Sequence, residues 1–334
     1  MNPATSKMDY KTKLASLFEN ELLPALNDFS SKQKRFPLYE PISYMMSLGG
    51  KRLRPLMVLA AADAYSASSK AAIPAAMAVE VFHNFTLMHD DIMDEAPLRR
   101  GKTTVHEKWN ANSAILSGDA MLVQAYECLT LCSAEVLPKL LPIFNQTALE
   151  VCEGQQLDMD FEQRSQVELP EYIEMIRLKT SVLLAAALKM GALIGGAKED
   201  EAQHLYRFGE SMGIAFQLQD DFLDAFGDPE KFGKQVGGDI ISDKKTYLWI
   251  RCMEKASEAD LKTVDTWIGE RNKGEEKVSF FKALFAKLEV DSEIQNTMES
   301  YYQDAMTHLN RANLKDEAQQ FFSAFARSLM VREN

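Results

Sequence analysis

The chain has 334 residues, of which 46% are apolar and 26% are charged, a composition that is ordinary for a globular protein with a sizeable core. Its 37 basic and 49 acidic residues give a net charge of −12, which argues against a nucleic-acid partner bound through a broad basic face. The length is compatible with one large domain or with two.

Helical periodicity runs through almost the whole sequence, and the alternation of half-buried strands is nearly absent. No linker rich in Pro, Gly or Ser separates two halves, so the sequence predicts one all-α domain over residues 1–334. The charged, amphipathic residues 254–334 are expected to form an outer layer of helices rather than a site. In chain order, we expect helices at Lys11–Asn27, Pro55–Ser66, Ala71–Asp94, Ala114–Cys132, Pro138–Arg164, Pro170–Gly191, Glu199–Phe226, Lys245–Lys255, Ala259–Glu270, Val278–Leu288, Ser292–Asn310 and Lys315–Val331.

The cysteines and the apolar segments indicate a cytoplasmic protein without integral membrane association. No CxxC pair is present, and we expect Cys128 and Cys132, which share a helix face, to be buried free thiols. Residues Met1–Tyr10 lack the apolar core of a signal peptide. The longest apolar stretch, Ser181–Ala197, is short for a membrane span and contains Lys189.

Two copies of one acidic pattern are the most informative feature: DDIMD at residues 90–94 and DDFLD at residues 220–224. Each copy ends an apolar helical run and is followed by a helix-ending signal, Pro97 or Gly227-Asp228-Pro229. Carboxylates at helix C-termini repel one another and the helix dipole unless cations lie between them, and Mg²⁺ is the natural occupant. The candidate metal ligands are therefore Asp90, Asp91, Asp94, Asp220, Asp221 and Asp224.

Compact basic groups lie near both acidic motifs in the sequence. They are Gly49–Pro55, with three cations at a helix start, residues 99–102 (RRGK), and Lys234 with Lys244 and Lys245. Carboxylates that hold a metal beside cations that hold phosphate describe a site for a diphosphate. Neither GxxxxGK[ST] nor GxGxxG occurs, so the sequence does not support a nucleotide site. Taken alone, one DDxxD motif or one basic run would most often be solvated surface. The inference of a diphosphate site rests on the combination of two DDxxD motifs with the basic groups near them.

Taken together, these motifs resemble the trans-isoprenyl diphosphate synthases, or polyprenyl synthetases. The matching segments span residues 49–248, about 60% of the chain. The resemblance implies an all-α helical bundle of the isoprenoid synthase type around a deep central cavity, and normally a homodimer. It also implies Mg²⁺-dependent condensation of isopentenyl diphosphate with dimethylallyl, geranyl or farnesyl diphosphate. The segments are GGKRLRP, LMHDDIMD, RRGKTTVH, SGDAML, EGQQLD, RLKTS, FQLQDDFLD, GKQVGGD and DKKT.

The resemblance also assigns roles to single residues. The six aspartates named above correspond to the family's Mg²⁺ ligands, chiefly the first and last of the first motif and the first of the second. One departure is Thr103, which stands where the family usually has Pro; we expect a change in loop stiffness there. The positions that bind the allylic diphosphate are Arg99, Lys179, Lys234 and Lys244. Those that bind isopentenyl diphosphate are Lys51, Arg54, His83 and Arg100, and those that line the reacting carbons are Lys179, Thr180 and Gln217.

Product length depends in this family on the side chains that precede the first motif. Phe85 lies five residues before Asp90, about 7.5 Å back along a helix, with the smaller Thr86 between them. This pattern resembles short-chain synthases and favours geranylgeranyl over farnesyl diphosphate as product. In this family a bulky side chain here forms the floor of the cavity against which the growing chain stops, and Phe82, one turn deeper, is a candidate second floor. We also expect a lid containing Gly227–Gly238 to exclude water from a carbocation.

Three alternatives are weighed against this assignment, and the sequence speaks against the last two, because it keeps the second DDxxD, the basic residues and every aspartate and arginine of the set. A longer-chain polyprenyl diphosphate synthase would differ only in the depth of its cavity. A class I terpene cyclase would carry an NSE/DTE-like motif in place of the second DDxxD, and it would not need the cations at Lys51 and Arg54. A regulatory subunit without activity would be expected to lack one of the aspartates or arginines.

Overall fold

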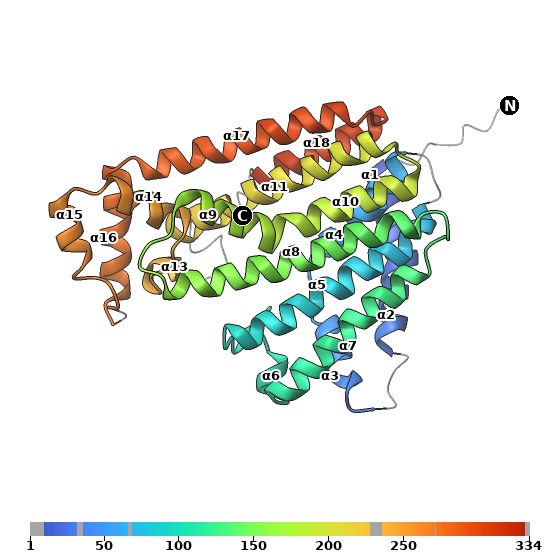
Figure 1. Cartoon of the computed structure of the whole chain (residues 1–334), viewed down its shortest axis with the longest axis horizontal. Helices are drawn as coiled ribbons and strands as arrows, with labels where there is room; N and C mark the ends of the chain where they lie inside the picture. The colour runs from blue at the N-terminus through green and yellow to red at the C-terminus, as the bar shows by residue number, and fades with distance from the viewer. Residues whose placement is uncertain (1–9, 32–35, 66–68, 228–235, 271, 331–334) are drawn as a thin grey trace. The chain divides into compact units, whose positions relative to one another are not determined.

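The computed structural model describes residues 10–31, 36–65, 69–227, 236–270 and 272–330 of the chain. These residues are almost entirely helical, so the prediction of an all-α fold is confirmed (Figure 1). The chain divides into two compact units. Unit 1 comprises Met1–Gln146, Ala186–Tyr206 and Asn310–Phe321, and unit 2 comprises Thr147–Ala185, Arg207–Leu309 and Phe322–Asn334. The single domain and the deep central cavity stay predictions.

The elements follow one another with short connections. They are, in chain order, α1 (Tyr10–Leu17), the π-helix η1 (Phe18–Leu22), α2 (Leu23–Ser31), α3 (Tyr39–Ser47), α4 (Leu53–Ala64), the 3₁₀-helix η2 (Ser69–Ala72), α5 (Ile73–Met93), β1 (Leu98–Arg99), β2 (Lys102–Thr103), α6 (Val105–Lys108), α7 (Ala111–Thr130), α8 (Leu137–Gln163), α9 (Leu169–Ile176), the π-helix η3 (Arg177–Ser181), α10 (Val182–Gly195), α11 (Glu199–Phe226), α13 (Gly238–Ile241), α14 (Tyr247–Lys255), α15 (Glu258–Val264), α16 (Gly274–Lys287), α17 (Val290–Arg311) and α18 (Asp316–Met330).

The structure adds elements that the sequence pattern did not reveal. Helix α3 was not predicted, and two predicted helices contain the π-helical turns η1 and η3. A π turn inserts one extra residue per turn, which a search for a 3.6-residue period does not detect. The strands β1 and β2 form a hairpin whose turn residues, Arg100 and Gly101, have φ of 52° and 73°. Both residues adopt the left-handed region that a tight hairpin turn requires.

Within unit 1, α5 packs extensively against α7 and also against α4. Small residues allow another close approach, between α10 and α4. A Cβ atom on Gly191 would lie 2.2 Å from the carbonyl oxygen of Val58, and one on Gly195 would lie 2.6 Å from that of Ala62. Glycines four residues apart therefore form a flat face on which α4 rests.

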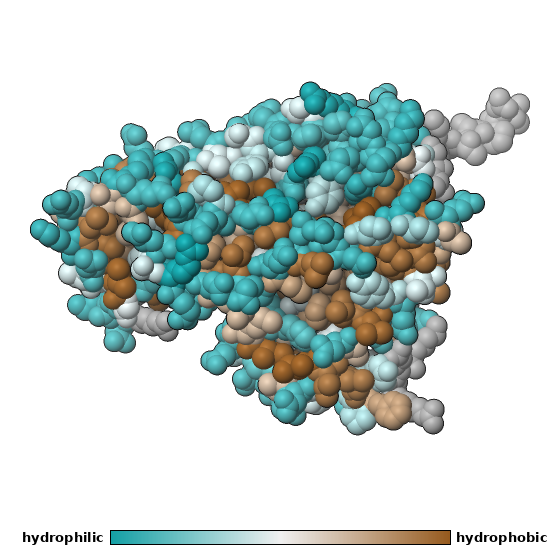
Figure 2. Space-filling model, in the orientation of Figure 1, coloured by the Kyte–Doolittle hydropathy of each residue, from teal (hydrophilic) through white to brown (hydrophobic). Residues whose placement is uncertain are grey.

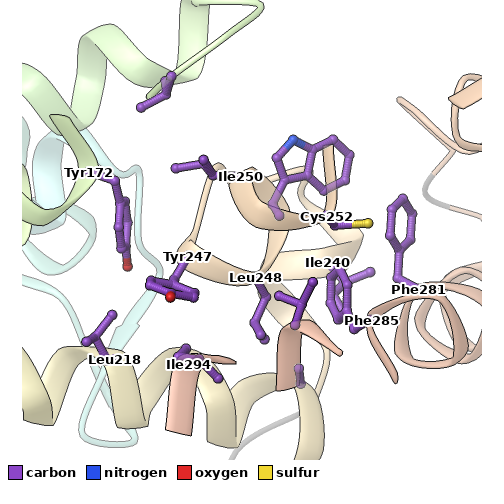
Figure 3. Packing of buried hydrophobic residues seen from close by; sticks show 14 of the residues in the cluster. Tyr172, Leu218, Ile240, Tyr247, Leu248, Ile250, Cys252, Phe281, Phe285 and Ile294 are labelled. Carbon is purple, nitrogen blue, oxygen red and sulfur yellow. The ribbon is translucent and has the colours of Figure 1, made fainter. Parts of the chain in front are cut away.

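Within unit 2, the core surrounds α14. Its buried residues come from α9, α11, α13, α16 and α17 as well. In Figure 3, Tyr172, Tyr247 and Leu218 lie on one side of this cluster and Phe281 and Phe285 on the other. Helix α9 begins at a capping box between Glu168 and Glu171, which fixes where the helix bearing Tyr172 starts (α9, Leu169–Ile176).

Two helical stretches are long and apolar enough to cross a membrane by length and composition alone, Lys70–Met93 and Leu169–Gly195. In the structure, 61% of the apolar window in the first and 78% of that in the second is buried inside the protein. Core helices of soluble proteins pass the same test, so these stretches give little support to a membrane span. As predicted, Cys128 and Cys132 are buried free thiols.

Candidate active site

The predicted site residues fall into two groups, one in each unit, and each group is described by itself. In unit 1, Asp90 and Asp91 lie in the last turn of α5, and Asp94 follows as its C-cap. The backbone N–H of Asp94 donates to the carbonyl of Asp90 at 2.9 Å, so the helix closes within the motif. The sequence therefore placed this motif correctly at a helix C-terminus.

The hairpin after α5 returns Arg99 to the acidic motif. Its Nε donates to Oδ1 and Oδ2 of Asp91 at 2.8 and 2.9 Å, and its Nη2 lies 3.5 Å from Oδ2 of Asp90. Asp91 is only 1% exposed. Burial raises the pKa of Asp91, and the hydrogen bonds and charge of Arg99 oppose that rise. A predicted phosphate ligand and a predicted metal ligand thus form one charged cluster.

A second cluster in unit 1 is basic. Arg54 Nη1 lies 3.2 Å from His83 Nε2, and Arg100 donates to the carbonyl of Gly49. Burial, followed by the charges of nearby arginines, first Arg54 and then Arg100, holds the pKa of His83 well below its ordinary value. His83 is therefore neutral near pH 7. Three of the four predicted isopentenyl diphosphate ligands come together in this way, while the fourth, Lys51, is exposed.

Sequence reasoning counted Arg52 among the cations placed for phosphate, and it missed Glu80 and Asn84, which support this basic cluster together with Arg52. Arg52 has φ of 46° at the start of α4 and forms an ion pair with Glu80 of α5. Its Nη2 donates to the carbonyl of Met46 at 2.5 Å, and Asn84 donates to Glu80 Oε1 at 2.7 Å. The only signal in the sequence was a glutamate within the apolar run of α5 and an extra arginine in GGKRLRP.

The residues predicted to set product length belong to an aromatic cluster in unit 1. The ring of Phe82 lies 5.5 Å from that of Phe85 and 5.2 Å from that of Phe144, and Phe85 lies 4.9 Å from His89. Phe82 and Phe85 are both buried. The hydroxyl of Thr86 donates to the carbonyl of His83 at 2.8 Å, which keeps it on the helix backbone. Their role in product length stays a prediction.

In unit 2, the second acidic motif lies in the last two turns of α11. Asp221 Oδ2 accepts hydrogen bonds from the hydroxyl of Tyr172 and, at 3.3 Å, from the backbone N–H of Tyr247. Asp224 Oδ2 accepts one from the backbone N–H of Asp239 at 3.0 Å. Burial and then the charge of Asp239 raise the pKa of Asp221 to about 7 and that of Asp224 to about 6.

The basic residues of unit 2 lie on other elements. Lys179, in η3, has its Nζ 2.6 Å from Asp158 Oδ2 on α8. A Cβ atom on Gly154 would lie 2.3 Å from the backbone nitrogen of Lys179, so only glycine permits this approach of α8 to η3. Burial raises the pKa of Asp221, and the charge of Lys244 offsets a small part of that rise. Sequence reasoning missed Asp158, although it ends the matching segment EGQQLD.

The other predictions in this region are only partly visible. Thr180 and Gln217 are half-buried, on η3 and α11. Lys234 and most of the segment predicted to form a lid lie outside the described residues, which stop at 227 and resume at 236.

The carboxylates suit a hard divalent cation, although no three His, Cys, Asp or Glu side chains in the described part of the chain lie close enough to hold a metal ion alone. All donors at the two motifs are oxygens, which Mg²⁺ prefers. Burial is the main cause of the raised pKa values of Asp221 and Asp224, and the nearby carboxylate of Asp239 adds to the rise. Mg²⁺ typically takes one or two carboxylates and completes its shell with water and phosphate oxygens, so the residues fit this ion.

Comparisons with known proteins agree with this chemistry. The polyprenyl synthetase family model matches residues 36–285. The chain is similar to a geranylgeranyl diphosphate synthase of Methanosarcina mazei, at 45% identity over 226 residues covering 67% of this chain and 70% of that protein. It is also similar to one of Sulfolobus acidocaldarius, at 36% identity, covering 89% of this chain and 92% of that protein. A crystal structure of a geranylgeranyl pyrophosphate synthase matches with a TM-score of 0.90 at 45% identity, covering 96% of this chain and 99% of that one.

Proposed function

Because this chain belongs to the polyprenyl synthetase family and is a prenyltransferase, we propose that it condenses isopentenyl diphosphate with dimethylallyl, geranyl or farnesyl diphosphate to make short-chain products. The reaction joins the two substrates head to tail and releases diphosphate. The observation that carries the proposal is the pairing in unit 1 of an acidic cluster, Asp90 and Asp91 with Arg99, with the basic cluster of Arg54, His83 and Arg100.

The basic cluster is proposed to bind isopentenyl diphosphate. The guanidinium groups of Arg54 and Arg100 supply charge and paired donors for phosphate oxygens. A neutral His83 adds a hydrogen-bonding ring without needing a proton, because its pKa is held low. Lys51, which is exposed, supplies a movable fourth cation from the glycine-flanked loop.

The two aspartate motifs are proposed to hold Mg²⁺ bound to the allylic diphosphate, through the six aspartates of residues 90–94 and 220–224. When bound, Mg²⁺ stabilises the negative charge that develops on the leaving diphosphate. Arg99, Lys179 and Lys244 add fixed positive charge toward the same group. Gln217 and the backbone carbonyls of Lys179 and Thr180 are proposed to stabilise the allylic cation that forms when the C–O bond of the allylic diphosphate breaks. The alkene of isopentenyl diphosphate then adds to this cation, and the resulting tertiary cation loses a proton from the isopentenyl unit to the departing diphosphate.

We favour geranylgeranyl diphosphate, the twenty-carbon product, over farnesyl diphosphate. The two relatives above carry the name geranylgeranyl diphosphate synthase, and Phe85 is a bulky buried side chain one turn before the first motif. A terpene cyclase has less support, because the chain retains both DDxxD motifs and the complete basic cluster. A longer-chain synthase has less support, because Phe85 and Phe82 are bulky and buried directly before the first motif.

We further propose a cytoplasmic homodimer. Support comes from α7 in unit 1, where large apolar side chains are exposed; Figure 2 shows apolar side chains gathered over this helix. At 100° per residue, Leu116, Val123 and Leu131 lie within about 80° of arc, so they form one stripe that a second copy could cover. Sedimentation of the wild type and of Leu116→Glu/Val123→Glu tests this, and equal masses would contradict it.

Incubation of the purified protein with Mg²⁺, isopentenyl diphosphate and each labelled allylic primer tests the function directly. The released prenols, sized by chromatography, should show twenty carbons from all three primers. Elongation that stops at fifteen carbons would show that the product is farnesyl diphosphate instead. Cyclised hydrocarbon from the allylic primer without isopentenyl diphosphate would overturn the condensation itself.

A further inference from the structure

Lys277, near the start of α16, is a buried amine that the proposed mechanism does not use. Its side chain is 0% exposed, and its Nζ lies 2.7 Å from Asp243 Oδ1 and donates to the carbonyl of Ile241 at 3.2 Å. A buried ammonium group requires such partners, because an unpaired charge in the interior is costly. Lys277 therefore fastens α16 to residues 236–246, a segment made of α13 and the turn that follows it.

The same segment is held at two further points. Asp243 has φ of 58°, in the left-handed region, and its Oδ2 accepts a hydrogen bond from the N–H of Gly269 at 2.9 Å. Both of its carboxylate oxygens are thus occupied. Gly237, with φ of 86°, lies against Val278, and a Cβ there would be 2.4 Å from Val278 Cγ2. Such backbone conformations persist only where the surroundings fix them.

Residues 236–246 also carry groups of the candidate active site. The N–H of Asp239 donates to Asp224 Oδ2 at 3.0 Å, and the N–H of Lys244 donates to the carbonyl of Asp239 at 3.0 Å. Tyr247, directly after the segment, donates its N–H to Asp221 at 3.3 Å. The position of the segment therefore determines which donors and charges face the second aspartate motif.

We propose that Lys277 is a positioning residue for the allylic diphosphate site, acting through its ion pair with Asp243. The pair holds residues 236–246 in register with α11, so that Asp239 and Lys244 lie correctly beside Asp221 and Asp224. This inference rests on the proposed function. It also gives helix α16 a part in the geometry of the site. Residues 254–334, which include α16, were expected from the sequence to lie outside the site.

The test uses Lys277→Met together with Asp243→Asn in the full-length protein. Replacing both partners leaves no lone buried charge, so the thermal midpoint should stay close to that of the wild type. The matched control is Lys287→Met with Asp260→Asn. It removes a 2.6 Å ion pair between Lys287, on the same helix as Lys277, and Asp260 of α15, and the Lys287 side chain is 61% exposed. Lys277→Met alone, which leaves Asp243 charged, should unfold at a lower temperature than the double variant.

The first readout is amide hydrogen exchange of residues 236–247, which needs neither substrate nor activity. Loss of the tether should speed exchange at Asp239 and Lys244 by about tenfold in the double variant and leave the control unchanged. The second readout is kinetic: KM for the allylic diphosphate should rise about fivefold, with KM for isopentenyl diphosphate within about twofold.

Each outcome decides something. Unchanged exchange, or faster exchange with both KM values unchanged, overturns the positioning role and leaves Lys277 as part of the core only. A wild type that makes no prenyl product in the presence of Mg²⁺ refutes the proposed function instead. In that case, amide hydrogen exchange still shows whether the Lys277–Asp243 pair holds residues 236–246.

Discussion

Arg52, at the start of α4, and Glu80, in α5, form an ion pair whose side chains are only 9% and 2% exposed. The pair joins the start of α4, which carries Arg54 and directly follows Lys51, to the helix that carries His83. Glu80→Gln removes one buried charge and leaves the guanidinium of Arg52 without its counter-ion. We expect a loss of stability on the order of 3 kcal/mol and a higher KM for isopentenyl diphosphate. Calorimetry and steady-state kinetics measure both effects.

Glu276→Gln, at an exposed position of α16, is the control for this substitution and should leave stability and kinetics unchanged. The combined change Arg52→Met/Glu80→Leu should recover much of the lost stability, because no lone charge remains. Equal stability of Glu80→Gln and the wild type would show that the Arg52–Glu80 pair does not stabilise the start of α4.

Asp94 and Glu95 offer a matched pair at the end of α5. Asp94 is the C-cap and the last carboxylate of the first motif, whereas Glu95 lies outside the motif and has φ of 49°. Both side chains are exposed. Asp94→Asn should raise the Mg²⁺ concentration needed for half-maximal activity by roughly tenfold or more. Glu95→Gln removes the same charge one residue away and should change it little. Similar shifts for the two variants would assign the effect to net charge instead of metal binding.

The sequence was sufficient to place both acidic motifs because helix periodicity and helix-ending residues are local signals. The C-terminal ends of α5 and α11 lie where those signals put them. The prediction that Cys128 and Cys132 are buried was likewise correct, since an apolar helix face indicates burial directly. The sequence could also nominate Arg54, His83 and Arg100 together, but only through resemblance to a family.

Partners from distant parts of the chain could not be predicted in this way. The contacts Arg52–Glu80, Lys179–Asp158 and Lys277–Asp243 join residues 21 to 34 positions apart. Each depends on how whole helices pack, and no local pattern encodes that packing. Gly154 is a further example. Only glycine permits the close approach of α8 to η3 at this position, and that approach depends on how the two helices pack.

Thiol reactivity should follow burial. Burial raises the pKa of Cys128 to about 12, that of Cys132 to about 11 and that of Cys252 to about 12, while Cys152 is exposed. Only the thiolate reacts, so at pH 8 a thiol with a pKa near 12 is ionised to about one part in ten thousand. A disulfide reagent should therefore label one thiol quickly in the native protein and four after unfolding. Fast labelling that persists in Cys152→Ser would contradict this.

The same shifts predict how stability depends on alkaline pH. A thiol in the unfolded chain ionises near its ordinary value of 9.0, whereas the folded protein keeps Cys128 protonated to about 12. Between these values the folded state binds more protons, so stability is fully present below pH 9 and falls as the pH rises toward 12. Thermal midpoints measured from pH 8 to 10.5 should decline. The decline should be shallower in Cys128→Ala, and an identical slope would remove this thiol as a cause.

Phe85→Ala should lengthen the product. Phe85 is buried on α5 between Phe82, at 5.5 Å, and His89, at 4.9 Å, so its loss opens space directly before the first motif. We expect prenols longer than those of the wild type by one or more five-carbon units. Phe82→Ala should lengthen the product further but cost about 3–5 kcal/mol of stability, because Phe82 is 1% exposed and also contacts Phe144. Chromatography of the dephosphorylated products gives the lengths.

Tyr126→Phe provides the control for these two variants. Tyr126 packs on Phe144 at 5.1 Å in the same aromatic cluster, and its hydroxyl donates to Asn145 at 2.8 Å. Removing only that hydroxyl keeps the volume of the cluster, so the product distribution should stay that of the wild type. If Phe85→Ala gives the same distribution as this control, the growing chain does not end at Phe85. A longer product from Phe82→Ala alone would then place the floor one turn deeper on α5.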